Sequence, residues 1–526
     1  MATSALNIQK LLALVLLATT TSAVNVPLAL APASEAPVIA AAHVSLSIEG
    51  DRWTSWSGTT SGNQFFYNLL DNIKQITGHA PNLRIGADSE DVAMYHSDVN
   101  FQQATFPNST VITPYPEANS LVVGDSYYQT IRFMPPGTHV TWGVNLGANN
   151  LTAAYLQTRA IANTFNSPAV KNAGIVLDHI EIGNEPDFYP SRGYRKGNWT
   201  AADYVENWTA FANNVSVAAG ITPASHTKFM ACSFASIDAG LSPTRAFDAG
   251  LVNSTSGKLI STISQHMYSG AFCSGGDFLL QGLMDKYTIR SNLTTLVPDI
   301  RETRARGLQY VLGETNSYAC HGAPGVSNTA GAALWQIDYS LYALQLGVSK
   351  LFFHQGIGYK YNMIQPAPLN WSSTTDAPLS PPQAPHIQPQ YYAALVVAEA
   401  IGMSTTTRVA EVFVDSAVVT GYAFYEKEQL VRAVFVNLNG YFNASAPRGS
   451  VHLDLAFAGQ GVQGPAAVSV KRLAIDYASD VAGLTWGGQT YETADGRVAG
   501  QLNMTTGPVS AGVDIWDSEA ILLSFQ

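Results

Sequence analysis

Hydrophobic positions along most of the chain follow two alternating patterns. Short apolar runs, such as residues 82–86 and 139–147, have the length and composition of buried strands. Longer segments repeat apolar residues every three or four positions, which is typical of a helix with one buried face. In residues 201–219 this stripe consists of Tyr204, Trp208, Phe211, Ala212 and Val215. The patterns predict strands and helices in alternation.

The strand-then-helix unit recurs about eight times between Val44 and Gly402. The strand-like segments are residues 43–49, 82–86, 139–147, 174–183, 228–236, 259–268, 308–314 and 348–356. This repetition predicts an α/β fold of the (β/α)₈ TIM-barrel type over residues 43–402. An open, doubly wound sheet is the alternative, but no Gly-rich phosphate turn follows the first strand.

The period changes after Gly402. Residues 403–526 contain short runs, several with alternating apolar and polar positions, separated by Gly, Asn and Asp. This pattern predicts a C-terminal antiparallel β-sandwich domain. The Pro- and Ala-rich segment 24–42 precedes the first barrel strand, and we expect it to add a strand to the sandwich.

Residues 1–23 have the features of a secretory signal peptide. Lys10 precedes an apolar stretch too short to span a bilayer, and small residues follow at Thr21 and Ala23. A buried N-terminal helix is the alternative. No later segment is long and apolar enough to span a membrane, so we expect a secreted, extracellular chain that begins near Val24.

Triplets of the N-x-S/T type give independent support for export. They begin at Asn108, Asn150, Asn198, Asn207, Asn214, Asn253, Asn292, Asn370, Asn443 and Asn503. Their density along the chain predicts a glycoprotein.

The chain has three cysteines, which allow at most one internal disulfide bond in an oxidising compartment. Cys232 lies in the apolar run FMACSF and is expected to be buried. Cys273 and Cys320 lie in loop-like segments, and we predict that these two pair.

The charge balance limits the classes of partner. A net charge of −11 and a pI near 5.4 weigh against a nucleic-acid partner. His266, His321 and His354 lack the close pairing that metal sites use, so we expect no metal and no cofactor. The sequence does not indicate an oligomeric state.

In a TIM barrel the active site lies at the carboxyl ends of the strands, so polar residues that end apolar strands are the candidates for catalysis. They are Glu49, Asp88, Asn184, Glu185, His266, Tyr268, Glu314 and His354. Glu185 in EIGNE and Glu314 in VLGETNSY form the pair of carboxyl groups that glycosidic cleavage needs. One must be protonated to act as the acid, and the other must stay ionised.

The neighbouring residues suit these two roles. Asn184 is a candidate to hydrogen-bond the sugar 2-hydroxyl. Tyr268 or Arg84 is a candidate to donate a hydrogen bond to Glu314, which would keep that carboxylate ionised. The alternative is structural: Glu185 would cap a helix and Glu314 would form a salt bridge.

Five segments, LRIGADSED, IEIGNEPDF, LGETNSYACHGAPG, KLFFHQGIGY and QYYAALVVAEAIG, resemble family 79 glycoside hydrolases, the β-glucuronidases and heparanase. The resemblance runs through the barrel in order. It implies a retaining mechanism with Glu185 as acid/base and Glu314 as nucleophile. It also implies that Glu49 contacts sugar hydroxyls.

The resemblance further implies that tyrosines and backbone N–H groups bind the carboxylate of glucuronic acid. Tyr359 matches the strand-eight tyrosine of the family. The strand-seven loop departs from the family pattern, since Tyr318 comes one place early and His321 replaces a glycine. Backbone N–H groups at Cys320 or His321 would then serve this role.

These features favour a hydrolase that releases terminal glucuronic acid, with its 4-O-methyl form as a variant substrate, from glucuronic-acid-containing glycans. A heparanase-like endo-enzyme is one alternative, but 27 Lys and Arg against 38 Asp and Glu would repel a sulfated chain. A catalytically inactive carbohydrate-binding barrel is the other.

Overall fold

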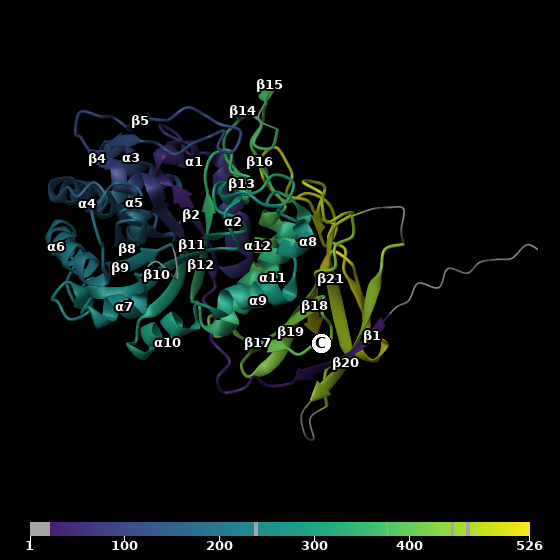
Figure 1. The fold of residues 1–526 in the computed structure, drawn as a ribbon. Coiled ribbons are helices and arrows are strands. Elements are labelled where there is room, and N and C mark those ends of the chain that lie inside the picture. Colours follow the sequence, from purple (N-terminus) through teal and green to yellow (C-terminus); the bar gives the residue numbers. More distant parts are fainter. Residues whose placement is uncertain (1–21, 236–239, 376, 443–446, 459–462) are drawn as a thin grey trace, which may run out of the picture.

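The computed structural model describes residues 22–235, 240–375, 377–442, 447–458 and 463–526. The predicted signal peptide, apart from its last two residues, and the triplet at Asn443 lie outside the described residues. Figure 1 shows two parts, a barrel surrounded by helices and a β-sandwich beside it.

The strands of the barrel are all parallel and form a closed ring. They are β2 (Val44–Glu49), β3 (Leu83–Gly86), β7 (His139–Val144), β8 (Val176–Ile182), β9 (Lys228–Phe234), β10 (Ile260–Tyr268), β11 (Gln309–Asn316) and β12 (Lys350–Gln355). β12 pairs with β2 and closes the ring. The predicted (β/α)₈ barrel is confirmed.

The longer helices lie in the connections between these strands and after β12. They are α2 (Gln64–Thr77), α4 (Leu151–Asn166), α6 (Ala201–Ala219), α9 (Lys286–Thr294), α10 (Val297–Ala305), α11 (Ala330–Leu346) and α12 (Gln390–Ile401). The sequence pattern explains their ends, as α2 shows: the Asn63 side chain accepts the Phe66 N–H, and Gly78 takes the left-handed conformation at φ 78°. The short helices are α1 (Trp53–Ser57), α3 (Asp125–Gln129), α5 (Pro168–Asn172), α7 (Pro243–Asp248) and α8 (Leu280–Leu283).

The connection from β3 to β7 is more elaborate than the sequence pattern indicates. It contains a small sheet of β4 (Ala93–Tyr95), β6 (Ser120–Val123) and β5 (Gln102–Thr105). Residues 126–134, whose sequence is also helix-like, are divided between α3 and the 3₁₀ turn η3 (Thr130–Phe133). Pro135 and Pro136 follow at once, and proline cannot continue a helix.

Two small hairpin-like sheets follow β12. β13 (Ile364–Gln365) pairs with β16 (His386–Ile387), and β14 (Leu369–Trp371) pairs with β15 (Pro378–Gln383).

The sandwich consists of two sheets with an apolar core between them. The larger contains β17 (Arg408–Val412), β18 (Val419–Glu426), β19 (Gln429–Asn437), β25 (Glu519–Phe525), β21 (Ala467–Ala474), β22 (Thr485–Trp486) and β23 (Thr505–Pro508). The smaller contains β1 (Ser22–Ala29), β20 (Ser450–Ala458) and β24 (Val513–Trp516).

β1 brings the start of the described chain into this C-terminal domain. It pairs with β20 in parallel register, whereas the other pairings of the two sheets are antiparallel. Val26 and Leu28 of β1 are fully buried in the sandwich core.

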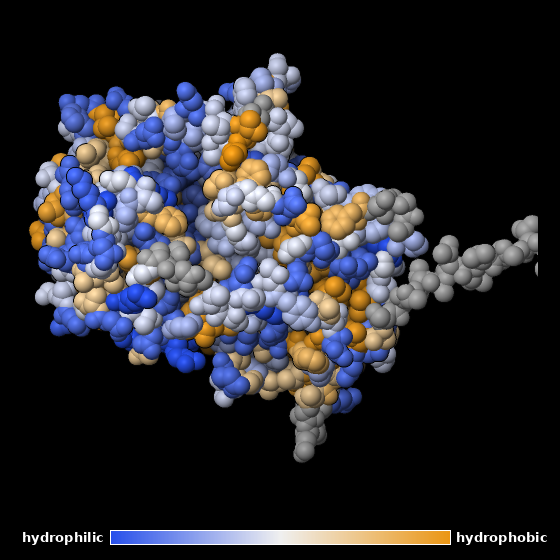
Figure 2. Space-filling view, in the orientation of Figure 1, coloured by the Kyte–Doolittle hydropathy of each residue, from blue (hydrophilic) through white to orange (hydrophobic). Residues whose placement is uncertain are grey.

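Helices α11 and α12 are buried on nearly every side because they lie between the barrel and the sandwich strands β17, β19 and β22 (Figure 1). Hydrophilic and hydrophobic residues are interspersed on the face of the molecule shown in Figure 2. Among the described residues, no helix combines the length and the hydropathy that crossing a membrane requires.

Candidate active site

A cavity of about 750 Å³ lies at the carboxyl ends of the barrel strands. The predicted site residues that line it are Glu49, Asp88, Glu185, Tyr268, Glu314, His321 and His354. They come from the ends of β2, β3, β8, β10, β11 and β12 or from the loops that follow these strands, so closure of the barrel brings together residues that are far apart in the sequence.

The backbone at Glu185 is unusual for a residue with a side chain. It adopts the left-handed conformation, with φ 49° and ψ 54°, after Gly183 at φ 81°. Its N–H donates to the Ser233 carbonyl of β9, and Pro186 starts the 3₁₀ turn η4 (Pro186–Phe188). Such a conformation costs about 1–2 kcal/mol, so the fold holds this carboxyl in place against local strain.

Two donors bind the Glu314 carboxylate. Arg84 on β3 donates from Nη1 to Oε2 at 2.9 Å, and the Tyr268 hydroxyl donates to Oε1 at 2.8 Å. Arg84 is fully buried and also donates from Nε to Glu181 Oε2 at 2.6 Å. The guanidinium is therefore fixed in orientation as well as charge.

These contacts keep Glu314 ionised. Burial alone would raise its pKa, but His354, His266 and Arg84 outweigh that effect and hold the pKa well below the usual range. Burial lowers the pKa of each of these histidines to about 4, so both are neutral at higher pH. Arg84 and the Tyr268 hydroxyl then remain as the groups that stabilise the carboxylate.

Glu185 has the opposite pKa shift. Burial raises the pKa of its carboxyl to about 7, against the positive charge of Arg192 and with a contribution from the negative charge of Glu314. Arg192 donates from Nη2 to Oε2 at 2.5 Å, and His266 Nδ1 lies 3.1 Å from Oε1. The raised pKa favours the protonated carboxyl that an acid catalyst needs.

The two acids face each other. One oxygen of Glu185, one oxygen of Glu314 and a nitrogen of His266 all lie within 4.8 Å of one another. Glu185, whose raised pKa favours the protonated form, and Glu314, whose lowered pKa favours the ionised form, therefore border the same small space. Acid-catalysed cleavage with a nucleophile requires such a pair.

Comparison with known proteins identifies the family. Residues 421–522 match the glycosyl hydrolase family 79 C-terminal β domain. Over 499 residues the chain is 30% identical to a β-glucuronidase of Aspergillus niger, an alignment that covers 90% of this chain and 87% of that protein. The chain belongs to glycoside hydrolase family 79. The resemblance in the sequence motifs is thus confirmed.

A second relative shares the sequence over most of the chain, and solved structures share the fold. A β-glucuronidase of Neurospora crassa is 27% identical over 511 residues, 88% of this chain and 87% of that protein. A crystal structure of a 4-O-α-L-rhamnosyl-β-D-glucuronidase from Fusarium oxysporum has a TM-score of 0.73 at 24% identity, covering 95% of this chain and all of that one. A family 51 arabinofuranosidase from Xanthomonas axonopodis, with a TM-score of 0.60 at 13% identity, shares the fold.

Asn184 and Asp88 of this family 79 protein lie beside the acids but are already bonded to other side chains. Asn184 accepts from Arg84 Nη2 at 2.7 Å and donates to Asp88 Oδ1 at 2.8 Å. Asp88 also accepts from Arg192 Nη1 at 2.5 Å. Asn184 is 1% exposed and is not among the residues that line the cavity.

Glu49 lines the cavity at the end of β2. Its Oε1 accepts the Ser89 N–H at 2.9 Å. Burial and the nearby carboxylates of Asp51 and Asp88 raise its pKa well above the usual range, which favours the protonated form of Glu49.

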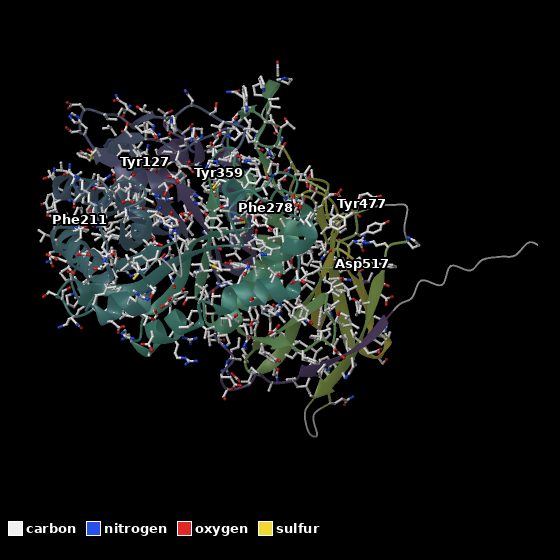
Figure 3. All side chains as sticks on the ribbon, viewed as in Figure 1. Tyr127, Phe211, Phe278, Tyr359, Tyr477 and Asp517 are labelled. Atoms are coloured by element: carbon white, nitrogen blue, oxygen red, sulfur yellow. A yellow bond between two sulfur atoms is a disulfide. The ribbon has the colours of Figure 1, made fainter. Side chains whose placement is uncertain are left out.

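Tyr318 and Tyr359, the two tyrosines of the predicted carboxylate site, make contacts with other side chains, and their binding of substrate stays a prediction. The Tyr318 ring packs edge-to-face on Phe278, and neither tyrosine is among the lining residues. The Tyr359 hydroxyl donates to Glu117 Oε1 at 2.8 Å, and its ring is stacked on His321 at 3.7 Å. Figure 3 labels Tyr359 within the barrel part of the molecule.

Several residues of the site carry no clear signal in the sequence. Glu117 lines the cavity, and His321 and Tyr359 lower its pKa to about 2 against the effect of burial. Glu117 lies on the long loop before β6 and does not follow an apolar barrel strand, which was the sequence signal for the other site residues. Arg192 follows η4, and the only available signal was its closeness to Asn184-Glu185 in the chain.

Cys273 and Cys320 form a disulfide bond, while Cys232 is free and buried. The bond joins the loop after β10 to the loop after β11. Backbone bonds join them too: Phe272 N–H donates to the Ala319 carbonyl at 3.1 Å, and Ala319 N–H to the Gly270 carbonyl at 2.8 Å. Both cysteines line the cavity.

Two groups of described residues have the ligand types of a metal site. They are Glu185, His266 and Glu314 in the cavity, and His139, Asp178 and His226 at the opposite end of the barrel. In the first group Arg84, Arg192 and Tyr268 already bind the carboxylate oxygens. The arrangement fits a pair of catalytic acids, and the expectation of no metal stays a prediction.

Proposed function

We propose that this protein is a retaining exo-β-glucuronidase. It releases terminal β-linked glucuronic acid from glycans, with Glu185 as acid/base and Glu314 as nucleophile. The named relatives from Aspergillus niger and Neurospora crassa are β-glucuronidases, which supports the choice of sugar.

The observation that carries this proposal is the pairing of two acids with opposite pKa shifts. In the first step Glu185 gives its proton to the leaving oxygen while ionised Glu314 attacks the anomeric carbon. In the second step Glu185, now ionised, takes a proton from water, which releases the sugar from Glu314. The gap of at most 4.8 Å between two of their oxygens favours retention, because inverting enzymes hold their carboxyl groups about 6.5–9.5 Å apart.

The charge of the cavity disfavours a sulfated glycan as substrate. Its acidic lining residues are Glu49, Asp88, Glu117, Glu185 and Glu314. Arg192 is the one Arg or Lys among the described residues that line it. A sulfated chain laid across this opening would meet repulsion. An inactive barrel is disfavoured because both acids border the same cavity.

Hydrolysis of nitrophenyl β-glucuronide tests the proposal. Wild type should release nitrophenol, Glu314→Gln should have no activity above background, and Glu185→Gln should lose roughly 10²- to 10⁴-fold. Glu302→Gln is the matched control, because Glu302 lies on the surface of α10 and pairs only with Arg306 four residues on. Equal rates for wild type and Glu314→Gln would contradict the assignment.

The same aglycone on β-glucoside and β-xyloside tests whether the sugar carboxylate matters. A preference for the glucuronide is expected. Comparable kcat/KM values for all three sugars would place the enzyme outside the β-glucuronidases while leaving the two acids in their roles.

We also propose that the protein is a secreted glycoprotein, on the basis of residues 1–23 and the N-x-S/T triplets. The triplet asparagines that are exposed are Asn108, Asn198, Asn253, Asn370 and Asn503. Asn207 and Asn214 are partly buried and their side-chain nitrogens donate hydrogen bonds, so the exposed set is expected to carry the glycans. Glycopeptide mapping of protein from a eukaryotic host measures this directly.

A further inference from the structure

Two chemically different kinds of residue line the cavity besides Glu185 and Glu314. Glu49, Asp88 and Glu117 contribute carboxyl groups. Phe188, Met267, Ala271 and the Cys273–Cys320 disulfide contribute apolar surface. A sugar ring covered with hydroxyl groups suits the carboxyl groups, which leaves the apolar surface without an assigned role.

Phe188 lies close to Glu185 in the chain and lines the same cavity. It ends η4, three residues after Glu185, and lines the cavity. Since the acid hands its proton to the oxygen of the leaving group, side chains on the open side of the acid meet that group. Phe188 is 37% exposed although it is a large apolar residue in the wall of a cavity. Exposed aromatic rings in binding clefts offer a flat surface for stacking.

Arg192 completes this corner. Its guanidinium bonds both Glu185 and Asp88, and its Cζ lies 5.6 Å from the centre of the Phe188 ring. The side chain is 28% exposed, so the guanidinium reaches the cavity. Two of its five N–H donors are used by the two carboxylates, and the others suit the hydroxyl oxygens of a sugar.

We propose that Phe188 and Arg192 form a subsite for the leaving group, and that this group is a neutral sugar ring. The inference rests on the proposed β-glucuronidase activity and adds the class of glycan that carries the glucuronic acid. Phe188 stacks on the apolar face of the ring, and Arg192 donates to its hydroxyls while it positions Glu185.

The charges around Arg192 favour a neutral ring as the leaving group. Arg192 is already matched by two carboxylates, Asp88 and Glu185, so this corner has no surplus positive charge. Glu117 and Glu314 add negative charge to the same cavity. An anionic leaving group, such as a second uronic acid or a sulfated sugar, would therefore find no unpaired positive charge at this corner, which favours a neutral ring there.

Two substrates with the same glucuronyl group separate this subsite from the sugar site. One is methyl β-glucuronide, which has no ring in the leaving group, and the other is glucuronic acid β-linked to a neutral hexose. Phe188→Ala should lower kcat/KM for the disaccharide roughly tenfold more than for the methyl compound. Phe188→Trp should restore the disaccharide preference, and Phe413→Ala, an exposed phenylalanine of the sandwich (73% exposed), should leave it as in wild type.

The pH profile of Arg192→Gln distinguishes a direct effect on Glu185 from a purely structural role of Arg192. Because the positive charge of Arg192 lowers the pKa of Glu185, its removal should shift the alkaline limb of the kcat/KM profile to higher pH. The disaccharide preference should fall as well.

The outcomes distinguish the two levels of the proposal. If wild type cleaves neither compound, the proposed β-glucuronidase activity is wrong. If wild type cleaves both and Phe188→Ala lowers both equally, the subsite is overturned and the activity stands. Faster cleavage of a disaccharide with a uronic acid as leaving group than of the neutral one would overturn the neutral class.

Discussion

Glu185 and Glu314 are the same amino acid with opposite protonation, and their neighbours account for the difference. Burial raises the pKa of both carboxyls. Glu314 receives hydrogen bonds from Arg84 and Tyr268, which stabilise its ionised form. Glu185 shares its one arginine with Asp88, so burial dominates there. The direction of each shift suits the role that we propose for the residue.

Tyr268→Phe tests the stabilisation of the nucleophile. The hydroxyl donates a charge-assisted bond to Glu314 at 2.8 Å, a bond worth about 1.5–3 kcal/mol. Its loss should reduce kcat/KM for nitrophenyl β-glucuronide roughly 10- to 100-fold. It should also move the acidic limb of the pH profile to higher pH, because the pKa of Glu314 rises.

Tyr318→Phe is the matched control for this experiment, since the Tyr318 ring packs on Phe278 and does not line the cavity. Its kcat/KM should stay within about twofold of wild type. A Tyr268→Phe variant with an unchanged acidic limb would contradict the role given to this hydroxyl.

The sequence predicted residues that end strands far better than residues on loops. Glu49, Glu185, Tyr268 and Glu314 each follow an apolar run, and closure of the barrel places them around one cavity. Glu117 has no such marker, because it reaches the cavity from a long connection that includes a small extra sheet. Tyr318 lies in a motif that suggested substrate contact, but its ring packs on Phe278 and is not among the residues that line the cavity.

At the scale of elements, the loops after β10 and β11 form one unit, held by the Cys273–Cys320 bond as well as by backbone hydrogen bonds. A disulfide that closes a loop of this size stabilises a protein by about 2–4 kcal/mol. The double variant Cys273→Ser/Cys320→Ser should therefore lower the free energy of unfolding. It should also raise KM, because Cys273 and Cys320 line the cavity.

Denaturant unfolding and steady-state kinetics of the double variant measure these effects, with each single variant for comparison. A double variant with wild-type stability and KM would show that the backbone bonds between the two loops are sufficient.

At the scale of the whole molecule, buried acids make stability depend on pH. Burial raises the pKa of Asp51 and Glu185 to about 7, of Asp88 and Asp91 to about 6, and of Glu49 and Glu90 well above the usual range. Between the unfolded value near 4 and these raised values, the folded state binds more protons than the unfolded chain. The acids therefore contribute stability at low pH that is lost as pH rises through about 7.

Buried histidines act in the opposite direction over a lower range. Burial lowers the pKa of His43, His179, His266 and His354 from 6.5 to about 4. Between those values the unfolded chain binds more protons, so this contribution to stability increases with pH. Below about pH 6.5 the buried acids and the buried histidines change the stability in opposite directions as pH rises. Above it, only the buried acids still change the stability. The Tm should therefore fall from pH 6.5 to pH 8.

Glu90→Gln tests this account. Glu90 is 3% exposed, and both of its carboxyl oxygens lack a hydrogen-bond partner among the described residues. An uncharged side chain of the same size should raise the Tm at pH 8 and leave it nearly unchanged at pH 5. Glu206→Gln on the exposed side of α6 is the control. A Tm gain of equal size at both pH values would contradict the ionisation argument.

Mass spectrometry of a trapped glycosyl-enzyme tests the central claim most directly. A 2-fluoro β-glucuronide with a reactive leaving group slows breakdown of the covalent intermediate, so that the sugar accumulates on the nucleophile. We predict that the added mass lies on the peptide that contains Glu314, and that Glu314→Gln takes up none. A sugar bound to Glu185, Glu117 or Asp88, or turnover of the glucuronide with no covalent adduct, would contradict the mechanism.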